Sequence, residues 1–250
     1  MLRERVSDDI YVFTSEIYAQ VTAGAVVSAE GAVIIDTLPF PSETLEILDF
    51  VQKRLNVPVK YVVNTHYHAD HTYGTCFFTG ADVVAHSKCR DLLDTVGRKG
   101  LAQAKADNPE LERIEVILPG VVFRHGQIDL HLGKKTLTLM HSPGHSPDSI
   151  MVLVKEDRIL FAGDTVMPLP HFVDGNIDDM TRSLQMIPPL GLENIVQGHG
   201  ELILRGEIDD AIRSNLKYLD ILRKKVSRLA DRGKSREALS HIDIESCGKS

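Results

Sequence analysis

One arrangement of strands and turns occurs twice in this sequence and limits the folds open to it. Residues 25–37, AVVSAEGAVIIDT, read as a β-hairpin that ends in Asp36 and a threonine, and residues 151–165, MVLVKEDRILFAGDT, read as a hairpin that ends in Asp164 and a threonine. Each hairpin is followed by a proline-bearing loop, a helix and an apolar strand that leads to histidines. Although α/β chains are often self-similar, we interpret the pattern as an internal duplication of a β-β-α-β unit.

Two such halves, packed sheet against sheet, would bury the apolar faces of both sheets and leave the helices outside. The pattern therefore predicts the α/β class, and within it a four-layer αβ/βα sandwich in which two β-sheets are flanked by helices. In such a sandwich the carboxyl ends of equivalent strands from both halves meet at one edge. Side chains that follow those strands are therefore expected to lie close together.

The period of the apolar residues predicts the remaining elements. Residues 42–55 carry apolar side chains at helical spacing behind a capping Ser42, and residues 206–232 form a longer amphipathic helix. A polar, helix-prone stretch runs from Ser87 to about Glu112. Short β-branched or alternating runs predict further strands over residues 10–15, 20–28, 59–65, 81–86 and 136–140.

Size and composition fit one large domain. With 250 residues, 43% of them hydrophobic, the chain can bury a sizeable core. We expect a single domain over residues 1–250, with its core at about 8–205 and an amphipathic helix and tail over 206–250. The net charge of −7 disfavours nucleic acid as a partner, because a groove for nucleic acid needs a basic surface.

Hydropathy and cysteine usage indicate where the protein acts. The amino terminus has no apolar run of the signal-peptide kind, and nowhere do eighteen or more apolar residues run together. The spacings of Cys76, Cys89 and Cys247 suggest neither disulfides nor a zinc site, so we read these residues as reduced thiols. We therefore expect a cytoplasmic protein without a membrane partner.

Residues 61–74, YVVNTHYHADHTYG, place four metal-binding side chains directly after an apolar strand. In an extended chain alternate side chains share a face, so His66, His68 and Asp70 can point the same way. A helical turn that starts after His68 would bring His71 beside it. Neutral imidazole and carboxylate suit Zn²⁺, and also iron or manganese. Because Asp70 and His71 are adjacent and diverge from the other pair, the spacing indicates two metal ions side by side.

Three more ligand-type residues stand at predicted strand ends. His145 lies in HSPGHSPDS after one strand, Asp164 lies in ILFAGDT, and His199 lies in IVQGHG between two glycines that allow close backbone approach. Each motif alone has a simpler reading, such as an ordinary loop or a helix cap. Together, at the edge shared by both halves, they predict a complete set of metal ligands.

The order of these motifs resembles that of the metallo-β-lactamase superfamily. Over about residues 8–205 the sequence carries counterparts of five family motifs, which are Asp36, HYHADH (66–71), PGH (143–145), GDT (163–165) and GHG (198–200). The resemblance implies the metallo-β-lactamase type of sandwich. It also admits a homodimer, because dimers are common on this fold, although that is an argument from analogy.

The resemblance implies a dinuclear site with Asp164 as the bridge between two ions. The other implied ligands are, for the first ion, His66, His68 and His145, and for the second ion, Asp70, His71 and His199. Asp36 would orient ligands through hydrogen bonds. The implied cofactors are two divalent metal ions, zinc in the first place, with iron or manganese as alternatives.

The activity that the resemblance implies is hydrolysis of an ester, thioester, lactone or related bond in a small-molecule substrate. Two ions about 3.5–4 Å apart can share a water and lower its pKa from about 15.7 toward 7, which yields a bridging hydroxide at neutral pH. We assign catalytic roles to Asp70, Asp164 and His171. Asp164 would relay the proton, and His171 would donate a proton or contact the substrate, although it also reads as an ordinary loop histidine. Residues 88–118 are expected to form a wall or lid over the metals.

Departures from known branches of the family narrow this function. Asp164 is present, whereas authentic metallo-β-lactamases generally lack the bridging aspartate, so only weak β-lactamase activity stays open. Tyr73 replaces the first glycine of the hydroxyacylglutathione hydrolase pattern, and Met167 replaces the tyrosine of homoserine-lactone lactonases. Persulfide dioxygenases, which hold a single iron with the counterparts of His66, His145 and Asp164, are the main alternative. A non-catalytic metal-binding module is a weaker one, because a structural site needs no bridging acid.

Overall fold

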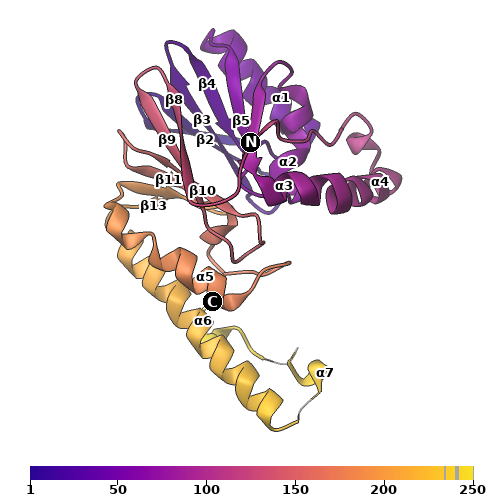
Figure 1. Cartoon of the computed structure of the whole chain (residues 1–250), viewed down its shortest axis with the longest axis vertical. Helices are drawn as coiled ribbons and strands as arrows, with labels where there is room; N and C mark the ends of the chain where they lie inside the picture. Colours follow the sequence, from indigo (N-terminus) through magenta and orange to yellow (C-terminus); the bar gives the residue numbers. More distant parts are fainter. Residues whose placement is uncertain (234, 240–241, 250) are drawn as a thin grey trace.

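Two β-sheets pack face to face in the computed structural model, which describes residues 1–233, 235–239 and 242–249 (Figure 1). The first sheet has the order β1-β2-β3-β4-β5-β6-β7. Its strands are Leu2–Ser7, Ile10–Thr14, Thr22–Ser28, Gly31–Ile35, Val59–Val63, Asp82–His86 and Val121–Phe123. The second sheet has the order β13-β12-β11-β10-β9-β8. From β8 to β13 its strands are Gln127–Leu132, Lys135–His141, Ile150–Val154, Ile159–Phe161, Asn194–Val196 and Ile203–Leu204.

Helices cover the outer faces of both sheets, as predicted (Figure 1). Helix α1 (Pro41–Asp49) packs on the first sheet, whereas α5 (Ile177–Gln185) and α6 (Ile208–Asp231) pack on the second. The remaining α-helices are α2 (Ala69–Thr72), α3 (Ser87–Leu92), α4 (Arg98–Asp107) and α7 (Arg236–Leu239). Short 3₁₀ turns lie at Tyr73–Phe77, Pro109–Leu111, Gly163–Thr165, Pro188–Leu190 and Glu245–Cys247. The predicted α/β class, with two sheets flanked by helices, is confirmed.

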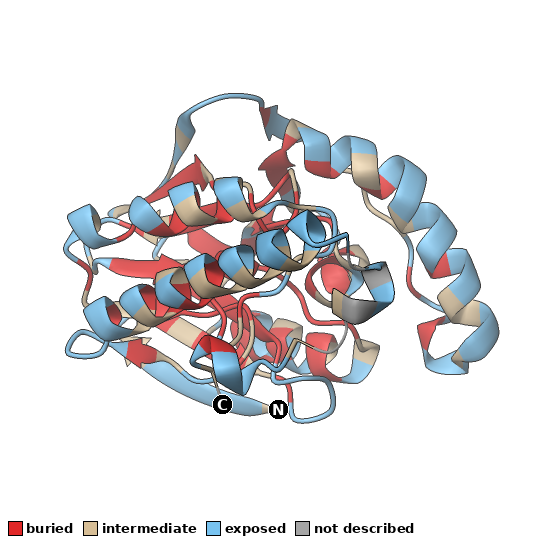
Figure 2. Cartoon of the chain, turned by 90° about the horizontal axis from the view of Figure 1, so that it is seen from below, coloured by how far each residue is buried: buried red, intermediate tan, exposed pale blue. Residues whose placement is uncertain are grey.

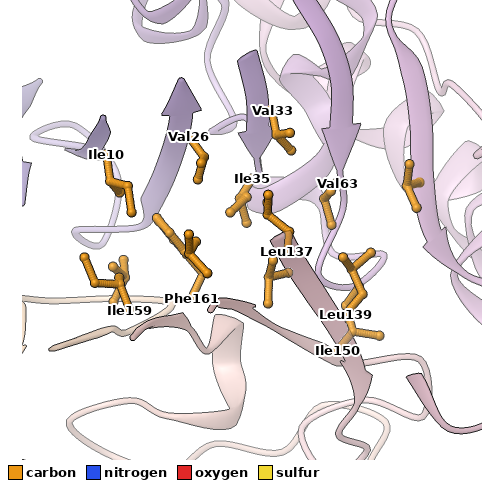
Figure 3. Close-up of a cluster of buried hydrophobic side chains, with 14 of the residues drawn as sticks. Ile10, Val26, Val33, Ile35, Val63, Leu137, Leu139, Ile150, Ile159 and Phe161 are labelled. Atoms are coloured by element: carbon orange, nitrogen blue, oxygen red, sulfur yellow. The ribbon is translucent and has the colours of Figure 1, made fainter. Parts of the chain in front are cut away.

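The central core lies between the two sheets (Figure 3). Ile35 and Val63 from the first sheet meet Leu137 and Phe161 from the second, and all four side chains are buried. Burying one such side chain contributes about 1.5–3 kcal/mol. The sheets approach closely at Gly24 on β3, where an added Cβ would stand only 2.1 Å from the ring of Phe161. Figure 2 shows the same separation of buried strands from exposed outer helix faces.

The two halves of the chain share one pairing pattern. In the first half β3 pairs antiparallel with β4, and β4 pairs parallel with β5. In the second half β10 pairs antiparallel with β11, and β11 pairs parallel with β12. Helix α1 follows the first hairpin and α5 follows the second. This pattern agrees with the duplicated β-β-α-β unit inferred from the sequence.

Helix α6 is amphipathic, in agreement with the predicted helix over 206–232. Ile208, Ile212 and Leu219 are buried against the outer face of the second sheet. The opposite face of the helix, which carries Lys224 and Arg228, is exposed. Among the described residues, no helix is both long and apolar enough to cross a membrane. The tail predicted to extend to residue 250 includes residues 234, 240, 241 and 250, which lie outside the described part of the chain.

Some predicted boundaries differ from the structure. The helix predicted over 42–55 begins at Pro41, so Ser42 lies inside its first turn and is not the cap. It is α-helical only to Asp49 and continues as a π-helical turn at Phe50–Arg54. The strand predicted from residue 20 begins at Thr22, because Ala19 and Gln20 adopt left-handed φ angles of 45° and 51°, which a strand excludes. Four strands were not predicted, and all four lie at sheet edges: β1, β7, β8 and β13.

Candidate metal centre

The predicted ligands lie at one edge of the sandwich, each after a strand. His66 and His68 follow β5, and α2, which begins at Ala69, carries Asp70 and His71. The backbone N–H of His71 donates to the carbonyl of His68 at 3.2 Å, so the helical turn begins where the sequence predicted it. The other ligand-type residues follow β9, β11 and β12, and are His145, Asp164 and His199.

Two groups of ligand-type atoms form at this edge. Within each group, one nitrogen or oxygen of every residue lies within 4.8 Å of the others, and the groups are His66, His68, His145 and Asp164, then Asp70, His71 and His199. The Asp164 carboxylate lies between the groups. Its oxygens stand 3.2 Å from Nε2 of His145 on one side and 3.1 Å from Nε2 of His71 on the other. The structure thus brings all seven residues together.

Several of these atoms are buried without a hydrogen-bond partner among the described residues. One is Nε2 of His66, whereas Nε2 of His71 and Oδ1 of Asp164 have only each other, 3.1 Å apart. A buried polar atom without a partner costs about 1–3 kcal/mol, so such atoms rarely gather without a reason. Imidazole nitrogens and carboxylate oxygens that converge in this way are the donor set of Zn²⁺ and related ions. The residues present therefore fit metal ions.

Hydrogen bonds on the far side of the rings aim three histidines into the site. In each ring Nδ1 donates to an oxygen at 2.8 or 2.9 Å: His71 to Oδ2 of Asp36, His145 to the carbonyl of His171, and His199 to the carbonyl of Ala19. An acceptor at Nδ1 holds a proton there, so in the neutral ring the lone pair of Nε2 points toward the site. This is the arrangement that a metal-binding histidine requires.

Asp36 supports two of the histidines, one directly and one through Thr65. Its Oδ2 accepts hydrogen bonds from Nδ1 of His71 at 2.8 Å and from the Thr65 hydroxyl at 2.7 Å, while Oδ1 accepts from the Thr65 N–H at 2.8 Å. The same hydroxyl oxygen lies 3.0 Å from Nδ1 of His66. Asp36 has a φ of 56°, a conformation in which aspartate is enriched several-fold over most residues.

His68 presents the opposite ring nitrogen. Its Nδ1 lies 2.9 Å from Nε2 of His145, whereas its Nε2 faces outward, 3.9 Å from Oδ2 of Asp174. The hydroxyl of Tyr67 donates to the same Asp174 carboxylate. Asp174 and Tyr67 were not predicted to support the site, because they are 107 residues apart and no local pattern connects them.

Burial sets the protonation of the first group. It lowers the pKa of His66 and of His145, and lowers that of His68 to about 4, so all three rings are neutral at pH 7. Neutral imidazole is the form that binds a metal ion. Burial alone would raise the pKa of Asp164, but His71 and other donors hold it well below its usual range, and the carboxylate is ionised.

In the second group, neighbouring carboxylates determine the direction in which the histidine pKa values shift. Burial opposes a charge on His71, yet the neighbouring Asp164 and Asp70 outweigh it and raise the pKa of His71 above its ordinary value. In the same way burial opposes a charge on His199, but hydrogen bonds to Asp164 and Asp70 raise its pKa to about 9. Both histidines therefore hold protons that a divalent cation would displace.

His171 contributes its backbone more directly than its side chain. Its carbonyl accepts the hydrogen bond from His145, while its imidazole is exposed, with its ring centre 6.3 Å from that of His145. Asp70 stands on the opposite side, with Oδ2 3.3 Å from Nε2 of His199. The catalytic roles assigned to Asp70, Asp164 and His171 stay predictions.

The segment over residues 88–118 packs against the chain that carries the ligands. Cys89 and Leu93 lie in a buried cluster with Tyr67, which stands between two ligand histidines. Leu101 and neighbouring apolar residues pack against Tyr73, at the end of α2. These contacts agree with the prediction that residues 88–118 form a wall beside the metal ligands. The alternative, that this segment is a lid that closes over the site, stays a prediction.

Comparisons with known proteins identify the family. The family model described as the metallo-beta-lactamase superfamily matches residues 18–229. A solved structure, a metallo-beta-lactamase from Pontibacter korlensis, shares the fold with a TM-score of 0.67 and 22% identity, and the match covers 85% of this chain and 97% of that one. The chain belongs to the metallo-β-lactamase superfamily, which confirms the resemblance seen in its motifs.

Curated relatives differ in the activities that their names state. The Beta-lactamase-like protein 2 homolog of Caenorhabditis elegans is 26% identical over 85% of this chain and 65% of its own length. The Acyl-coenzyme A thioesterase MBLAC2 of Bos taurus is 29% identical over 55% of this chain and 54% of that protein. The cytoplasmic hydroxyacylglutathione hydrolase of Saccharomyces cerevisiae is 28% identical over 62% of this chain and 53% of that protein. The chain thus spans less than two thirds of the length of these relatives.

Proposed function

We propose that this chain is a hydrolase that uses two divalent metal ions, zinc in the first place, to cleave acyl thioesters or closely related ester bonds. The observation that carries this proposal is the position of Asp164. Its carboxylate lies 3.2 Å from Nε2 of His145 and 3.1 Å from Nε2 of His71, between two groups of ligand-type residues. A carboxylate at that place suits a bridge between two ions, which a single structural ion does not need.

The names of relatives support an acyl substrate. The bovine relative is called an acyl-coenzyme A thioesterase and the yeast relative a hydroxyacylglutathione hydrolase. A further relative, from Aspergillus terreus, is called atrochrysone carboxyl ACP thioesterase and is 22% identical over 83% of this chain and 59% of its own length. We extend thioester cleavage to this chain as a proposal. Water adds to the acyl carbon, the carbon–sulfur bond breaks, and an acid and a thiol leave.

The residues of the chain have distinct parts in this reaction. When bound, the ions supply Lewis-acid chemistry that polarises the carbonyl and lowers the pKa of water toward about 7. Asp164, ionised and aimed between the two groups of ligand-type residues, is placed to accept a proton from the attacking water. His171, exposed beside His145, is placed to return a proton to the departing thiolate.

Metal content and turnover, measured on the same purified protein, test the proposal. We expect two divalent ions per chain and hydrolysis of acyl-coenzyme A or other thioesters that a chelator abolishes and added zinc restores. Asp164→Asn should lower turnover by about 10²–10⁴-fold, because it keeps the shape of the side chain and removes the proton acceptor. Asp49→Asn, at an exposed position on α1, is the matched control and should keep full activity.

Three outcomes would contradict the proposal. One iron per chain, with oxidation of a persulfide and no hydrolysis, would favour the single-iron alternative. Two bound ions without turnover on any thioester, ester or lactone would leave a metal-binding module. Full turnover by Asp164→Asn at full metal content would exclude the proton transfer assigned to this residue.

A further inference from the structure

We propose that Glu43 is a positioning residue for His199 and acts through the turn at residues 15–20. The inference rests on the proposed function in one respect, namely that His199 holds one of the two ions. Glu43 lies in the first turn of α1, on the outer side of the first sheet, whereas His199 follows β12 of the second sheet. Two sets of hydrogen bonds, joined by the backbone of residues 15–20, connect the two residues.

The first set begins at a buried carboxylate. Glu43 is 3% exposed, and its Oε2 accepts a hydrogen bond from the hydroxyl of Ser15 at 2.6 Å, while Oε1 accepts from the N–H of Glu16 at 3.1 Å. The α-amino group of Met1 lies 3.6 Å from Oε1. Hydrogen bonds to an ionised acceptor are about twice as strong as neutral ones, so this carboxylate holds Ser15 and Glu16 firmly.

Ser15, which is held by Glu43, in turn holds the backbone of the turn through two further hydrogen bonds. Its hydroxyl oxygen accepts from the N–H of Ile17 at 3.2 Å and from the N–H of Tyr18 at 2.9 Å. The turn is closed by backbone hydrogen bonds of 2.9 and 3.0 Å that Val21 makes with Ser15 and Tyr18. The hydroxyl therefore donates to Glu43 and accepts from the turn at the same time. Loss of the carboxylate would release the Ser15 side chain and, with it, the turn.

The tip of the turn holds a strained backbone. Ala19 and Gln20 both have positive φ, 45° and 51°, and neither is a glycine. Such a conformation is unfavourable for a residue with a Cβ and persists only where the surroundings enforce it. The hydrogen bonds from Glu43 and Ser15 supply that enforcement at the base of the turn.

The two strained residues supply the carbonyls that hold the His199 segment. The carbonyl of Ala19 accepts from Nδ1 of His199 at 2.9 Å, and the carbonyl of Gln20 accepts from the N–H of Gly200 at 3.0 Å. Because a carbonyl can only accept, the proton sits on Nδ1 and Nε2 faces the site, 3.3 Å from Oδ2 of Asp70. A relaxed turn would move the Ala19 carbonyl away and leave Nδ1 of His199 without its acceptor.

The consequence is a selective loss of one ion. In the group of Asp70, His71 and His199, the turn holds His199. In the other group, His66 and His145 have their outer hydrogen-bond partners in Thr65 and His171. Loss of an outer hydrogen-bond partner of a metal ligand typically costs tenfold to a hundredfold in metal affinity. Glu43→Gln and Ser15→Ala should therefore weaken binding of one of the two ions by about that factor.

The test is a titration of the metal-free full chain with Co²⁺. Binding is measured by calorimetry and by the visible absorption of the bound cobalt. We expect Glu43→Gln and Ser15→Ala to weaken one binding step and to leave the other within about twofold of wild type. Glu46→Gln, at an exposed position on the same helix, is the matched control and should leave both steps unchanged. If Glu43→Gln fails to fold, Ser15→Ala, which removes only a hydroxyl, decides the question.

A second readout needs no metal. In proton–nitrogen NMR spectra of the metal-free protein, the Nδ1–H of His199 should be protected from exchange in wild type and in Glu46→Gln, and lose that protection in Glu43→Gln. Unchanged protection in Glu43→Gln, together with two unchanged binding steps, would overturn the role of Glu43. An equal weakening of both binding steps with a lowered melting temperature would also overturn it, because it would show a general loss of structure. If wild type binds a single ion, the proposed two-ion function fails, and the NMR signal still decides whether Glu43 positions His199.

Discussion

Asp36 makes three hydrogen bonds from a backbone conformation that few residues adopt. Replacing it by asparagine keeps the size of the side chain and the tolerance for positive φ, but removes the carboxylate that fixes the proton on Nδ1 of His71. We expect Asp36→Asn to lower metal affinity by about tenfold to a hundredfold, and stability by about 1–3 kcal/mol. Calorimetric metal titration and urea unfolding of the metal-free protein measure the two effects.

The control for this experiment is Asp8→Asn, because the Asp8 side chain is almost fully exposed. This variant should match wild type in both measurements. Wild-type metal affinity in Asp36→Asn would show that His71 keeps its orientation without the carboxylate, and the support described for Asp36 would then be wrong.

At the scale of single residues, side chains with metal-binding chemistry could be predicted and their supporting atoms could not. Histidines and aspartates at strand ends carry a chemical signal that survives in the bare sequence, and the structure brings all seven together. The acceptors for His145 and His199 are main-chain carbonyls, of His171 and Ala19, and every residue has such a carbonyl. Only the fold decides which carbonyl meets which ring.

At the scale of elements, the start of α3 depends on a histidine. His86 caps the helix: its Nδ1 accepts from the N–H of Lys88 at 3.3 Å, and its Nε2 donates to the carbonyl of Arg124 at 3.0 Å. Its ring stacks on that of His141 from the other sheet, with the centres 4.0 Å apart. Because both ring nitrogens are engaged in the neutral form, a second proton would break the cap.

Stability should accordingly fall in acid. Burial, with His141, Lys88 and His125 nearby, lowers the pKa of His86 to about 4, below the ordinary 6.5. The unfolded chain therefore takes up the proton first, so this stabilisation is complete above pH 6.5 and is lost as the pH falls toward 4. We expect a loss of about 2 kcal/mol from this group over that range.

Urea unfolding of the metal-free protein at pH 7 and at pH 4.5 measures this effect, with His86→Gln as the comparison. The variant should be less stable than wild type at pH 7 and close to it at pH 4.5. An equal gap between the two proteins at both pH values would exclude His86 as the source.

The position of a strand in its sheet decided whether the sequence predicted it. The central strands β4, β5 and β10 are almost entirely apolar, and their patterns were read correctly. The missed strands are edge strands: β1 is mostly exposed, and β13 has only two residues. The edge strand β8, QIDLHL, does alternate polar and apolar residues, so its period could have been read from the sequence.

For the whole molecule, the separation of the two sheets should be sensitive to Gly24. An added Cβ at this position would stand 2.1 Å from the buried ring of Phe161, so Gly24→Ala must push the sheets or the ring aside. We expect a loss of about 1–3 kcal/mol in urea unfolding, the usual cost of overpacking a core. Gly120→Ala, where an added Cβ meets nothing within 4 Å, should change stability by less than about 0.5 kcal/mol. Equal stability of the two variants would mean that the ring of Phe161 moves freely.

The backbone also joins the two sheets at the edge where the site lies. Val21 forms an isolated β-bridge with His199, and the N–H of Thr22 donates to the carbonyl of Gly198 at 2.9 Å. These bonds need no ion, so demetallated protein should keep the frame of its site. Exchanging one divalent ion for another by simple dialysis, with no refolding step, ought then to give a homogeneous preparation.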